Sequence, residues 1–256
     1  MADDIPWTER ELRKQMVRAC HALASRGLVA ATDGNVTAKL GPDRILVTPS
    51  SLSKGEVTEL SILVCDLDGR LIRGRSGSKV SSEVHLHLAA YRTRPEIGAV
   101  VHAHPPVATA FTFSGREHLL RDPIIPEVVA QIGPIETCPY VTPGTRALGE
   151  AAAPFFKACD VVLLAQHGAV ALGSTPWRAY LRMEKLEQAA AILKTSAELA
   201  GSAEAVRRLT PAQTKDLIVN YGDPKLLGRY GLDAKRDTES ELVERVAAAV
   251  LKRLGA

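Results

Sequence analysis

Two histidines at the end of a predicted strand are the residues of this 256-residue chain that could most directly do chemistry. Gly98–His102 is a short apolar run rich in valine, and Ala103, His104 and two prolines follow it. A spacing of two places both imidazoles on the same side of an extended chain. Such a pair could supply two ligands to Zn²⁺, which needs one or two more. Two histidines can also fall at this spacing by chance, so the surrounding sequence has to decide.

Two further residues are candidates for completing a metal site. Glu83 follows two serines at the predicted start of a helix, and His167 follows the apolar strand predicted over residues 161–165. His87 lies four residues after Glu83 and therefore on the same helical face, which makes it another candidate. Supporting a ligand through a hydrogen bond is the role we expect of His87.

Three turns rich in hydroxyl and amide side chains form a second group of chemically useful residues. The predicted helix start contributes free backbone N–H groups and a dipole, both of which favour an anion. Together these donors could bind a phosphate, although each residue taken singly also fits a helix cap or a turn. The six residues are Thr32, Asn35, Ser50, Ser51, Ser81 and Ser82.

The elements that must position these residues alternate between short strands and capped helices. Thr–Pro pairs and other capping residues predict helices that begin near residues 8, 145, 175 and 210, and a last amphipathic helix over 240–254. Asp68–Gly69 predicts a tight hairpin, so the early strands should pair antiparallel. The pattern favours an α/β class, with a mixed sheet covered by helices on both faces of one domain. Residues 115–133 have no clear assignment.

Composition and charge exclude several classes of protein. The 32 Lys and Arg against 29 Asp and Glu leave a net charge of +3, too little for a nucleic-acid binder. No apolar stretch reaches the ~18 residues that a membrane span needs, and no signal peptide precedes the first helix, so we expect a cytoplasmic protein. The four cysteines are scattered and are expected to be reduced thiols.

Several short motifs, taken in order over about residues 9–200, resemble the class II aldolase/adducin family. The pattern is most similar to the fuculose-1-phosphate and ribulose-phosphate aldolases of that family. No single motif decides the resemblance, but the order and spacing of the set are specific. The motifs are Gly34-Asn35-Val36-Thr37, Thr48-Pro49-Ser50, Ser81-Ser82-Glu83, the run from Ala99 to Pro105, Pro143-Gly144-Thr145 and His167-Gly168.

The resemblance implies a three-layer α/β/α domain over residues 1–256, with 202–256 as a helical C-terminal extension, and a homotetramer. It implies retro-aldol cleavage of a ketose 1-phosphate, a small phosphorylated sugar, to dihydroxyacetone phosphate and an aldehyde through a metal-stabilised enediolate. The metal would be Zn²⁺ or another divalent ion such as Mn²⁺, and Glu83 would also act as base and acid. The implied metal ligands are Glu83, His102, His104 and His167, and the implied phosphate pocket is formed by Thr32, Asn35, Ser50, Ser51, Ser81 and Ser82.

Two positions depart from the family pattern. Ser51 replaces the usual glycine of the Thr-Pro-Ser turn, and Glu127 falls where fuculose-type aldolases have a catalytic tyrosine. Glu127 is therefore the expected second proton-transfer residue, with Tyr221 or Tyr230 as alternatives. Three other functions stay open: metal-dependent decarboxylation of a hydroxylated aromatic acid or a sugar acid, dehydration of a sugar phosphate, and a non-enzymatic adducin-like module. Retention of all four ligands favours an enzyme.

Overall fold

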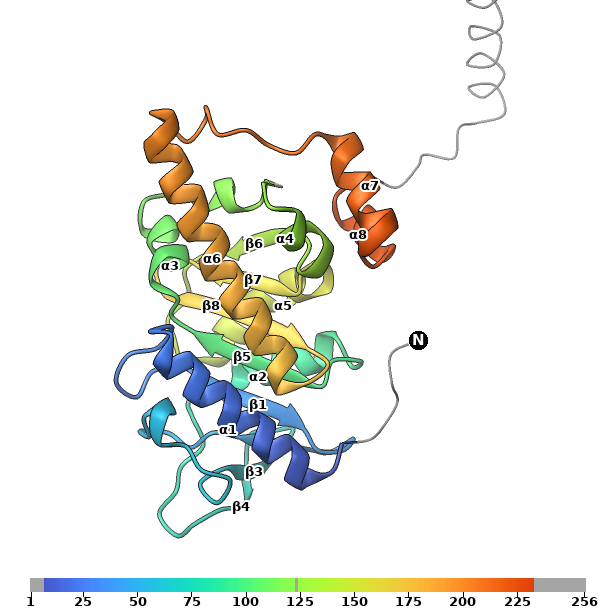
Figure 1. Ribbon diagram of the computed structural model, residues 1–256. Coiled ribbons are helices and arrows are strands. Elements are labelled where there is room, and N and C mark those ends of the chain that lie inside the picture. The colour runs from blue at the N-terminus through green and yellow to red at the C-terminus, as the bar shows by residue number, and fades with distance from the viewer. Residues whose placement is uncertain (1–6, 123, 233–256) are drawn as a thin grey trace, which may run out of the picture.

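An eight-stranded mixed sheet forms the centre of the computed structural model, which describes residues 7–122 and 124–232 (Figure 1). Its strand order is β4-β3-β2-β1-β5-β8-β7-β6, and every neighbouring pair is antiparallel except the parallel pair β6 and β7. The strands are β1 (Asn35–Lys39), β2 (Arg44–Val47), β3 (Leu63–Asp66), β4 (Leu71–Arg73), β5 (Ala99–Ala103), β6 (Ile135–Cys138), β7 (Val161–Leu164) and β8 (Gly168–Gly173).

Helices cover both faces of this sheet (Figure 1). One layer contains α1 (Glu9–Ser25), α3 (Pro106–Phe113) and α6 (Pro176–Ala200), and the other contains α2 (Val84–Thr93) and α5 (Arg146–Ala158). Successive strand residues point to opposite faces. Val101 accordingly packs in the core under α1 and α6, whereas Val100 packs under α2 and α5. The arrangement confirms the predicted three-layer α/β/α fold.

The predicted helix starts lie where the threonines indicated. Thr8, Thr145 and Thr175 occupy the N-cap positions of α1, α5 and α6, and each hydroxyl accepts a hydrogen bond from a backbone N–H of the first turn. Thr210 does the same for α7 (Pro211–Tyr221). Each cap satisfies one of the N–H groups that a helix start leaves without a partner.

One predicted helix start lies too early in the chain. The helix expected to open at Ser81 and Ser82 begins at Val84, with Glu83 in the N-cap position. The hydroxyl of Ser81 accepts a hydrogen bond from the backbone N–H of Glu83 at 3.3 Å, which favours a turn before the helix. Glu83 therefore lies on that turn, and its side chain contacts His102 and His167.

The segment left unassigned contains two short helices, and a third short helix follows β2. They are η2 (Glu117–Leu120), α4 (Pro126–Gln131) and, after β2, η1 (Lys54–Glu56). Pro126 occupies the first turn of α4, where its missing N–H costs nothing.

Helices also form the described part of the predicted C-terminal extension. Ile218 of α7 and Leu226 of α8 (Lys225–Arg229) pack against Val129 of α4, so this part covers its own chain. The helix expected over 240–254 lies outside the described residues, and the single-domain assignment stays a prediction. Within residues 7–122 and 124–232, no helix combines the length and the apolar character needed to cross a bilayer. All four cysteines are buried, unpaired thiols.

Candidate metal and substrate site

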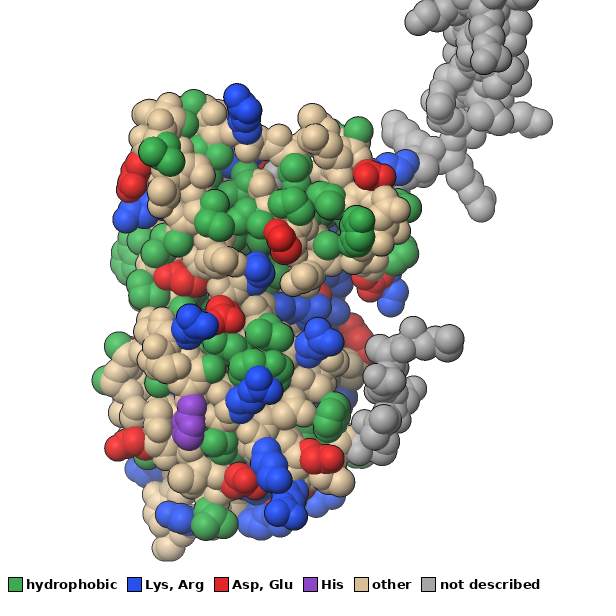
Figure 2. Space-filling model, in the orientation of Figure 1, with side chains coloured by type: hydrophobic (Ala, Val, Ile, Leu, Met, Phe, Trp, Pro, Cys, Tyr) green, Lys and Arg blue, Asp and Glu red, His purple; other side chains and the backbone are tan. Residues whose placement is uncertain are grey.

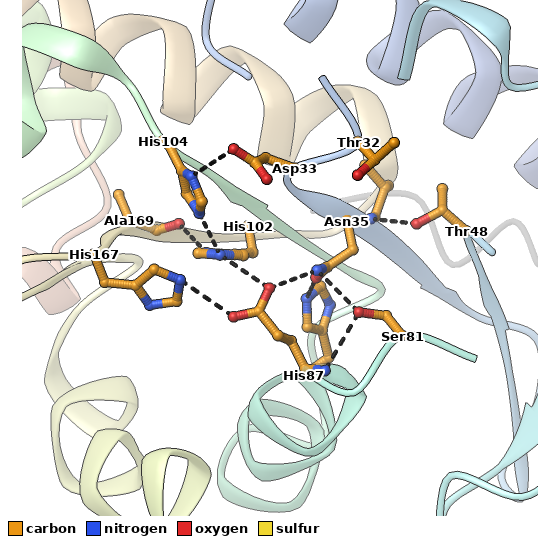
Figure 3. Close-up of polar contacts among 12 residues, drawn as sticks. Thr32, Asp33, Asn35, Thr48, Ser81, His87, His102, His104, His167 and Ala169 are labelled. Carbon is orange, nitrogen blue, oxygen red and sulfur yellow. Dashed lines mark hydrogen bonds and ion pairs between the residues drawn. The ribbon is translucent and has the colours of Figure 1, made fainter. Parts of the chain in front are cut away.

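Three histidines converge at one end of the central strands (Figure 3). His102 and His104 come from the end of β5, and His167 comes from the turn between β7 and β8. One ring nitrogen from each lies within 4.8 Å of the other two. The antiparallel register pairs His102 with Val170, so the turn that precedes β8 returns His167 to the same end of the sheet.

The backbone at His167 is held in a narrowly defined conformation. Gln166 has a φ of +55°, a left-handed value that non-glycine residues seldom adopt, and its N–H donates to Thr112 Oγ1 at 3.0 Å. A Cβ on Gly168 would lie 2.5 Å from the carbonyl oxygen of Ala103 and 2.7 Å from His104 Cδ2. Glycine is therefore required after His167, because a larger residue would displace the neighbouring ligand strand.

Contacts at the Nδ1 atoms of His102 and His104 leave the Nε2 atom of each of these two rings facing the centre of the cluster. His102 Nδ1 must donate to the carbonyl oxygen of Ala169 at 2.9 Å, so Nε2 is the nitrogen that faces the cluster. His104 Nδ1 lies 3.5 Å from Asp33 Oδ2, and its Nε2 faces His102 Nε2 at 3.1 Å. Burial, with the added positive charge of His102 and His167, lowers the pKa of His104 to about 4. The neutral imidazole that results is the form that binds metals.

The carboxylate of Glu83 lies against two of these histidines. Its Oε2 is 3.3 Å from His102 Nε2, and its Oε1 is 3.2 Å from His167 Nε2. Burial would raise the pKa of Glu83, but the two histidines outweigh burial and hold the pKa far below its usual range. Glu83 Oε1 and His167 Nδ1 are buried and make no hydrogen bond within the described residues. Three imidazoles and one carboxylate with unsatisfied buried atoms suit a divalent transition metal.

A buried series of hydrogen bonds between side chains orients the carboxylate of Glu83. Asn35 Nδ2 donates to Glu83 Oε2 at 3.0 Å, and Asn35 Oδ1 accepts from His87 Nε2. Burial above all, with the charge of His102, lowers the pKa of His87 to about 3, so its ring is neutral and its Nδ1 accepts. Thr37 Oγ1 therefore donates to His87 Nδ1 at 2.8 Å.

The far end of this series is the hydroxyl of Tyr91. Because the single proton of the Thr37 hydroxyl goes to His87, the Tyr91 hydroxyl must donate to Thr37 Oγ1, at 2.9 Å. Each residue of the series thus donates its hydrogen bond to the next one, in the direction from Tyr91 to Glu83. His87 thus lies behind Glu83 as a hydrogen-bonding support, the role expected of it, and it is not one of the three histidines that converge.

A cavity of about 250 Å³ opens beside the cluster. Glu83 and His104 form part of its wall. Ser51 in this wall has a φ of +59°, the left-handed conformation that glycine adopts without strain. No Lys or Arg is among the lining residues. The six residues predicted to bind phosphate all line this cavity: Thr32, Asn35, Ser50, Ser51, Ser81 and Ser82.

A lysine that the sequence did not single out lies behind this cavity. Lys54 is 1% exposed, and its ammonium donates to the carbonyl oxygens of Thr32 at 3.0 Å and Leu52 at 2.6 Å. Burial lowers the pKa of Lys54, and Cys20 and Asp33 oppose that shift. A lone lysine after a turn has no sequence signature, so Lys54 could not have been predicted. Asp33 also lines the cavity and could have been predicted from its position between Thr32 and Gly34.

None of the predicted second proton-transfer residues reaches the cavity of its own chain. Glu127 is exposed on α4, and Tyr221 is 80% exposed at the end of α7. Tyr230 packs against the cluster formed by Val129, Ile218 and Leu226. The structure therefore brings together ten of the eleven predicted site residues, and Glu127 lies apart from them.

An aldolase and a decarboxylase are among the known proteins similar to this chain. A sequence profile described as the class II aldolase and adducin N-terminal domain matches residues 14–193. An L-fuculose phosphate aldolase from Methanococcus vannielii is 35% identical over 177 residues, which is 69% of this chain and 92% of the relative. A 3-oxo-tetronate 4-phosphate decarboxylase from Haemophilus influenzae is 31% identical over 212 residues, which is 82% of this chain and 97% of the relative.

Two solved structures are also similar to this chain. YgbL from Klebsiella pneumoniae, whose description offers aldolase, epimerase and decarboxylase as alternatives, superposes with a TM-score of 0.73 at 32% identity and covers 82% of this chain and 99% of that chain. An L-fuculose 1-phosphate aldolase superposes with a TM-score of 0.69 at 27% identity and covers 85% of this chain and 96% of that chain.

Proposed function

Because the chain belongs to the class II aldolase and adducin family, whose profile spans residues 14–193, we propose that it cleaves a carbon–carbon bond in a small phosphorylated sugar derivative. The observation that carries this proposal is the shared wall of the cavity. Glu83 and His104 line the same space as the six polar residues of the predicted phosphate pocket. A substrate with its phosphate in these loops would therefore place its carbon chain beside the histidine cluster.

The three histidines and Glu83 would hold a divalent ion, Zn²⁺ or Mn²⁺. Such an ion supplies a Lewis acid that stabilises negative charge as the bond breaks. Glu83 is ionised and is oriented by Asn35, so its carboxylate can take up a proton and later return it to carbon. The side chains of Ser50, Ser51 and Ser82 would donate to the phosphate oxygens.

Retro-aldol cleavage of a ketose 1-phosphate is the first candidate reaction. The C3–C4 bond breaks, its electron pair stays on C3, and the C4 hydroxyl loses its proton as the aldehyde forms. Glu83, once it has taken up a proton from water, protonates C3 and gives dihydroxyacetone phosphate. This reaction needs a second group to take the C4 hydroxyl proton, and the predicted group is Glu127. Its exposed position on α4 requires that it act in a neighbouring subunit of the predicted homotetramer.

Decarboxylation of a phosphorylated 3-oxo acid is the second candidate. Loss of CO₂ from 3-oxo-tetronate 4-phosphate leaves the electron pair on C2, and protonation of C2 also gives dihydroxyacetone phosphate. One proton donor is enough, because CO₂ leaves without losing a proton. The titratable groups that line the cavity are Asp33, Glu83 and His104. This short list favours decarboxylation, which needs one proton donor, over retro-aldol cleavage, which needs a second proton-transfer group. The decarboxylase relative also covers 82% of the chain, against 69% for the aldolase.

One assay separates the two reactions. The metal-loaded protein is incubated with a panel of ketose 1-phosphates and, separately, with 3-oxo-tetronate 4-phosphate, each with and without a chelator. Dihydroxyacetone phosphate is measured together with the aldehyde or the CO₂. Chelator-sensitive product with an aldehyde supports the aldolase, and product with CO₂ supports the decarboxylase. If neither substrate class gives dihydroxyacetone phosphate, the proposal is wrong.

A further inference from the structure

A second and larger cavity, of about 740 Å³, lies at the other end of the central strands from the histidines. Ile97, Gly173 and Ser174 line it, and the N–H of Gly98, just before β5, donates to the carbonyl oxygen of Gly173 at 2.9 Å. His102 follows Gly98 by four residues, a distance of about 13 Å along an extended chain. The two cavities are therefore separate.

Positive charge dominates the wall of this second cavity. Figure 2 shows Lys and Arg side chains gathered in a recess between α6 and α8. Glu96, Asp160 and Asp223 are the acidic residues of the wall, so its charged side chains sum to +3, the net charge of the entire chain. The basic residues are Arg94, Arg178, Arg182, Lys185, Lys225 and Arg229.

Asp160, the buried carboxylate of this wall, is already shared by three guanidinium groups. It lies 2.9 Å from Arg182 Nη2, 3.1 Å from Arg94 Nη1 and 3.3 Å from Arg229 Nη1. Glu96 forms an ion pair with Arg94 as well. The buried carboxylate therefore has no capacity left to balance the remaining cations of the cavity.

Three of the cations have no carboxylate partner among the described residues. Arg178 and Lys185 come from α6 and Lys225 comes from α8, and only Lys185 has a side-chain hydrogen bond, to Gln188 at 2.8 Å. Arg178 and Lys185 flank Arg182 on one helical face, where like charges on successive turns repel. Burial lowers the pKa of Arg182, and although Asp160 opposes this shift, Arg229, Arg94 and Arg178 add to it.

We infer that this cavity binds a small organic anion that carries two or more phosphate or carboxylate groups, held between Arg178 and Lys185 of α6 and Lys225 of α8. The Cα atoms of Arg178 and Lys185 are about 10 Å apart along the helix, which suits charged groups at two ends of one molecule. Ile97, Ile132, Leu181 and Leu226 also line the cavity and offer apolar contact to a carbon body. The inference does not depend on which reaction the first cavity performs.

Bound at this position, the anion would connect α8 to α6. In the described residues, α8 is held by the ion pair of Arg229 with Asp160 and by Leu226 in the small apolar cluster with Val129 and Ile218. A ligand that bridges Lys225 and Lys185 would add a direct link between the two helices. Backbone amides of α8 should then exchange more slowly with solvent.

Hydrogen–deuterium exchange of the metal-loaded full chain with 2,3-bisphosphoglycerate as the probe tests this site. We expect protection of α8 and of the first turns of α6, and a loss of probe affinity of at least about tenfold in the double variant Lys185→Gln/Lys225→Gln. The matched control is Lys194→Gln/Lys215→Gln, which removes the same charge from α6 and α7 outside the cavity and should keep the binding.

Three results would overturn the inference. Protection confined to the loops at Ser50 and Ser82 would place the anion in the first cavity. Equal binding by both double variants would show that the cavity lysines are not involved, and equal protection by sodium chloride at matched ionic strength would show screening alone. Because Lys225 is exposed, the single variant Lys225→Gln provides the same comparison if the double variant does not fold.

Discussion

The buried ammonium of Lys54 donates a hydrogen bond to the backbone carbonyl of Thr32 at 3.0 Å. A second hydrogen bond, to the carbonyl of Leu52, connects it to the loop that carries Ser50 and Ser51. Lys54 thus joins two loops of the first cavity and supplies positive charge behind a wall that contains Asp33 and Glu83 but no Lys or Arg. A phosphate that enters the cavity would be attracted by the positive charge of the Lys54 ammonium, which lies behind the loop backbone.

Replacing Lys54 with methionine should weaken phosphate binding. We expect the affinity for inorganic phosphate, measured by calorimetry, to fall about tenfold or more, because an attraction between partly buried unit charges exceeds ~1.4 kcal/mol. Lys39→Met is the matched control, since Lys39 also donates to a backbone carbonyl, that of Pro95 at 2.7 Å, but lies outside the cavity. Equal affinity in both variants would contradict this role of Lys54.

Replacing Ser51 with glycine should separate backbone strain from phosphate binding. Glycine removes the strain of the left-handed conformation, which stabilises the folded chain, but it also makes the unfolded chain more flexible, which opposes this gain. The net effect should be a rise in the free energy of unfolding of about 0.5–1 kcal/mol. Loss of the hydroxyl should weaken phosphate binding at the same time. Ala31→Gly, at a φ of +46° outside the cavity wall, should give the stability gain alone. Urea titration and calorimetry measure the two effects, and unchanged phosphate affinity in Ser51→Gly would remove Ser51 from the pocket.

Thr37→Val should slow turnover without removing the metal. The variant keeps the shape of the side chain but leaves His87 and Tyr91 without their hydrogen-bond partner, at a cost of about 2–3 kcal/mol in stability. The orientation of Asn35, and with it that of Glu83, should then loosen, so kcat should fall more than KM rises. Thr37→Ser keeps the hydroxyl and should restore kcat. A Thr37→Val enzyme with normal kcat would show that the chain of hydrogen bonds only stabilises the fold.

Glu83→Gln should abolish turnover while most of the metal remains bound. The amide keeps the shape of the carboxylate but cannot exchange a proton with carbon, and the three histidines still offer their nitrogens. Metal content by atomic absorption and product formation by the assay above give the two readouts. Full activity in this variant would disprove the proton-transfer role of Glu83.

The metal-free protein should lose stability as the pH falls from 7 to 5. His87 has a pKa of about 3 in the folded chain, against 6.5 when unperturbed. Between these values the unfolded chain binds a proton that the folded chain does not, so acid favours unfolding. His87 alone should contribute about 2 kcal/mol over this range, measured by urea unfolding at several pH values. A His87→Gln variant should show a flatter dependence, and an equal slope would contradict the assignment.

Local signals in the sequence predicted most of the fold and most of the site. Threonine caps and β-branched runs located the long helices and the strands because they act through neighbouring residues. The histidine pair and the hydroxyl turns were recognisable from their order along the chain. Both cavities nevertheless depend on contacts between distant segments, which explains why other features were missed.

The missed features share a physical reason. The burial of Lys54 and the three guanidiniums around Asp160 arise only when separate helices and loops pack together. Glu127 was matched by its position in the chain, and that position does not show which way α4 would face. The early helix start at Ser81 was predicted because a serine turn and a serine cap look the same in a sequence.

The pairing of β5 with β8 has a consequence for how the protein depends on its metal supply. His102 and His167 are far apart in the chain, and they meet only after these two strands have paired. An unfolded chain therefore lacks the binding site, and a bound ion would stabilise the folded form alone, by about 2.7 kcal/mol at a free concentration one hundred times the Kd. Scarcity of the ion would then lower the amount of folded protein as well as the activity of each molecule.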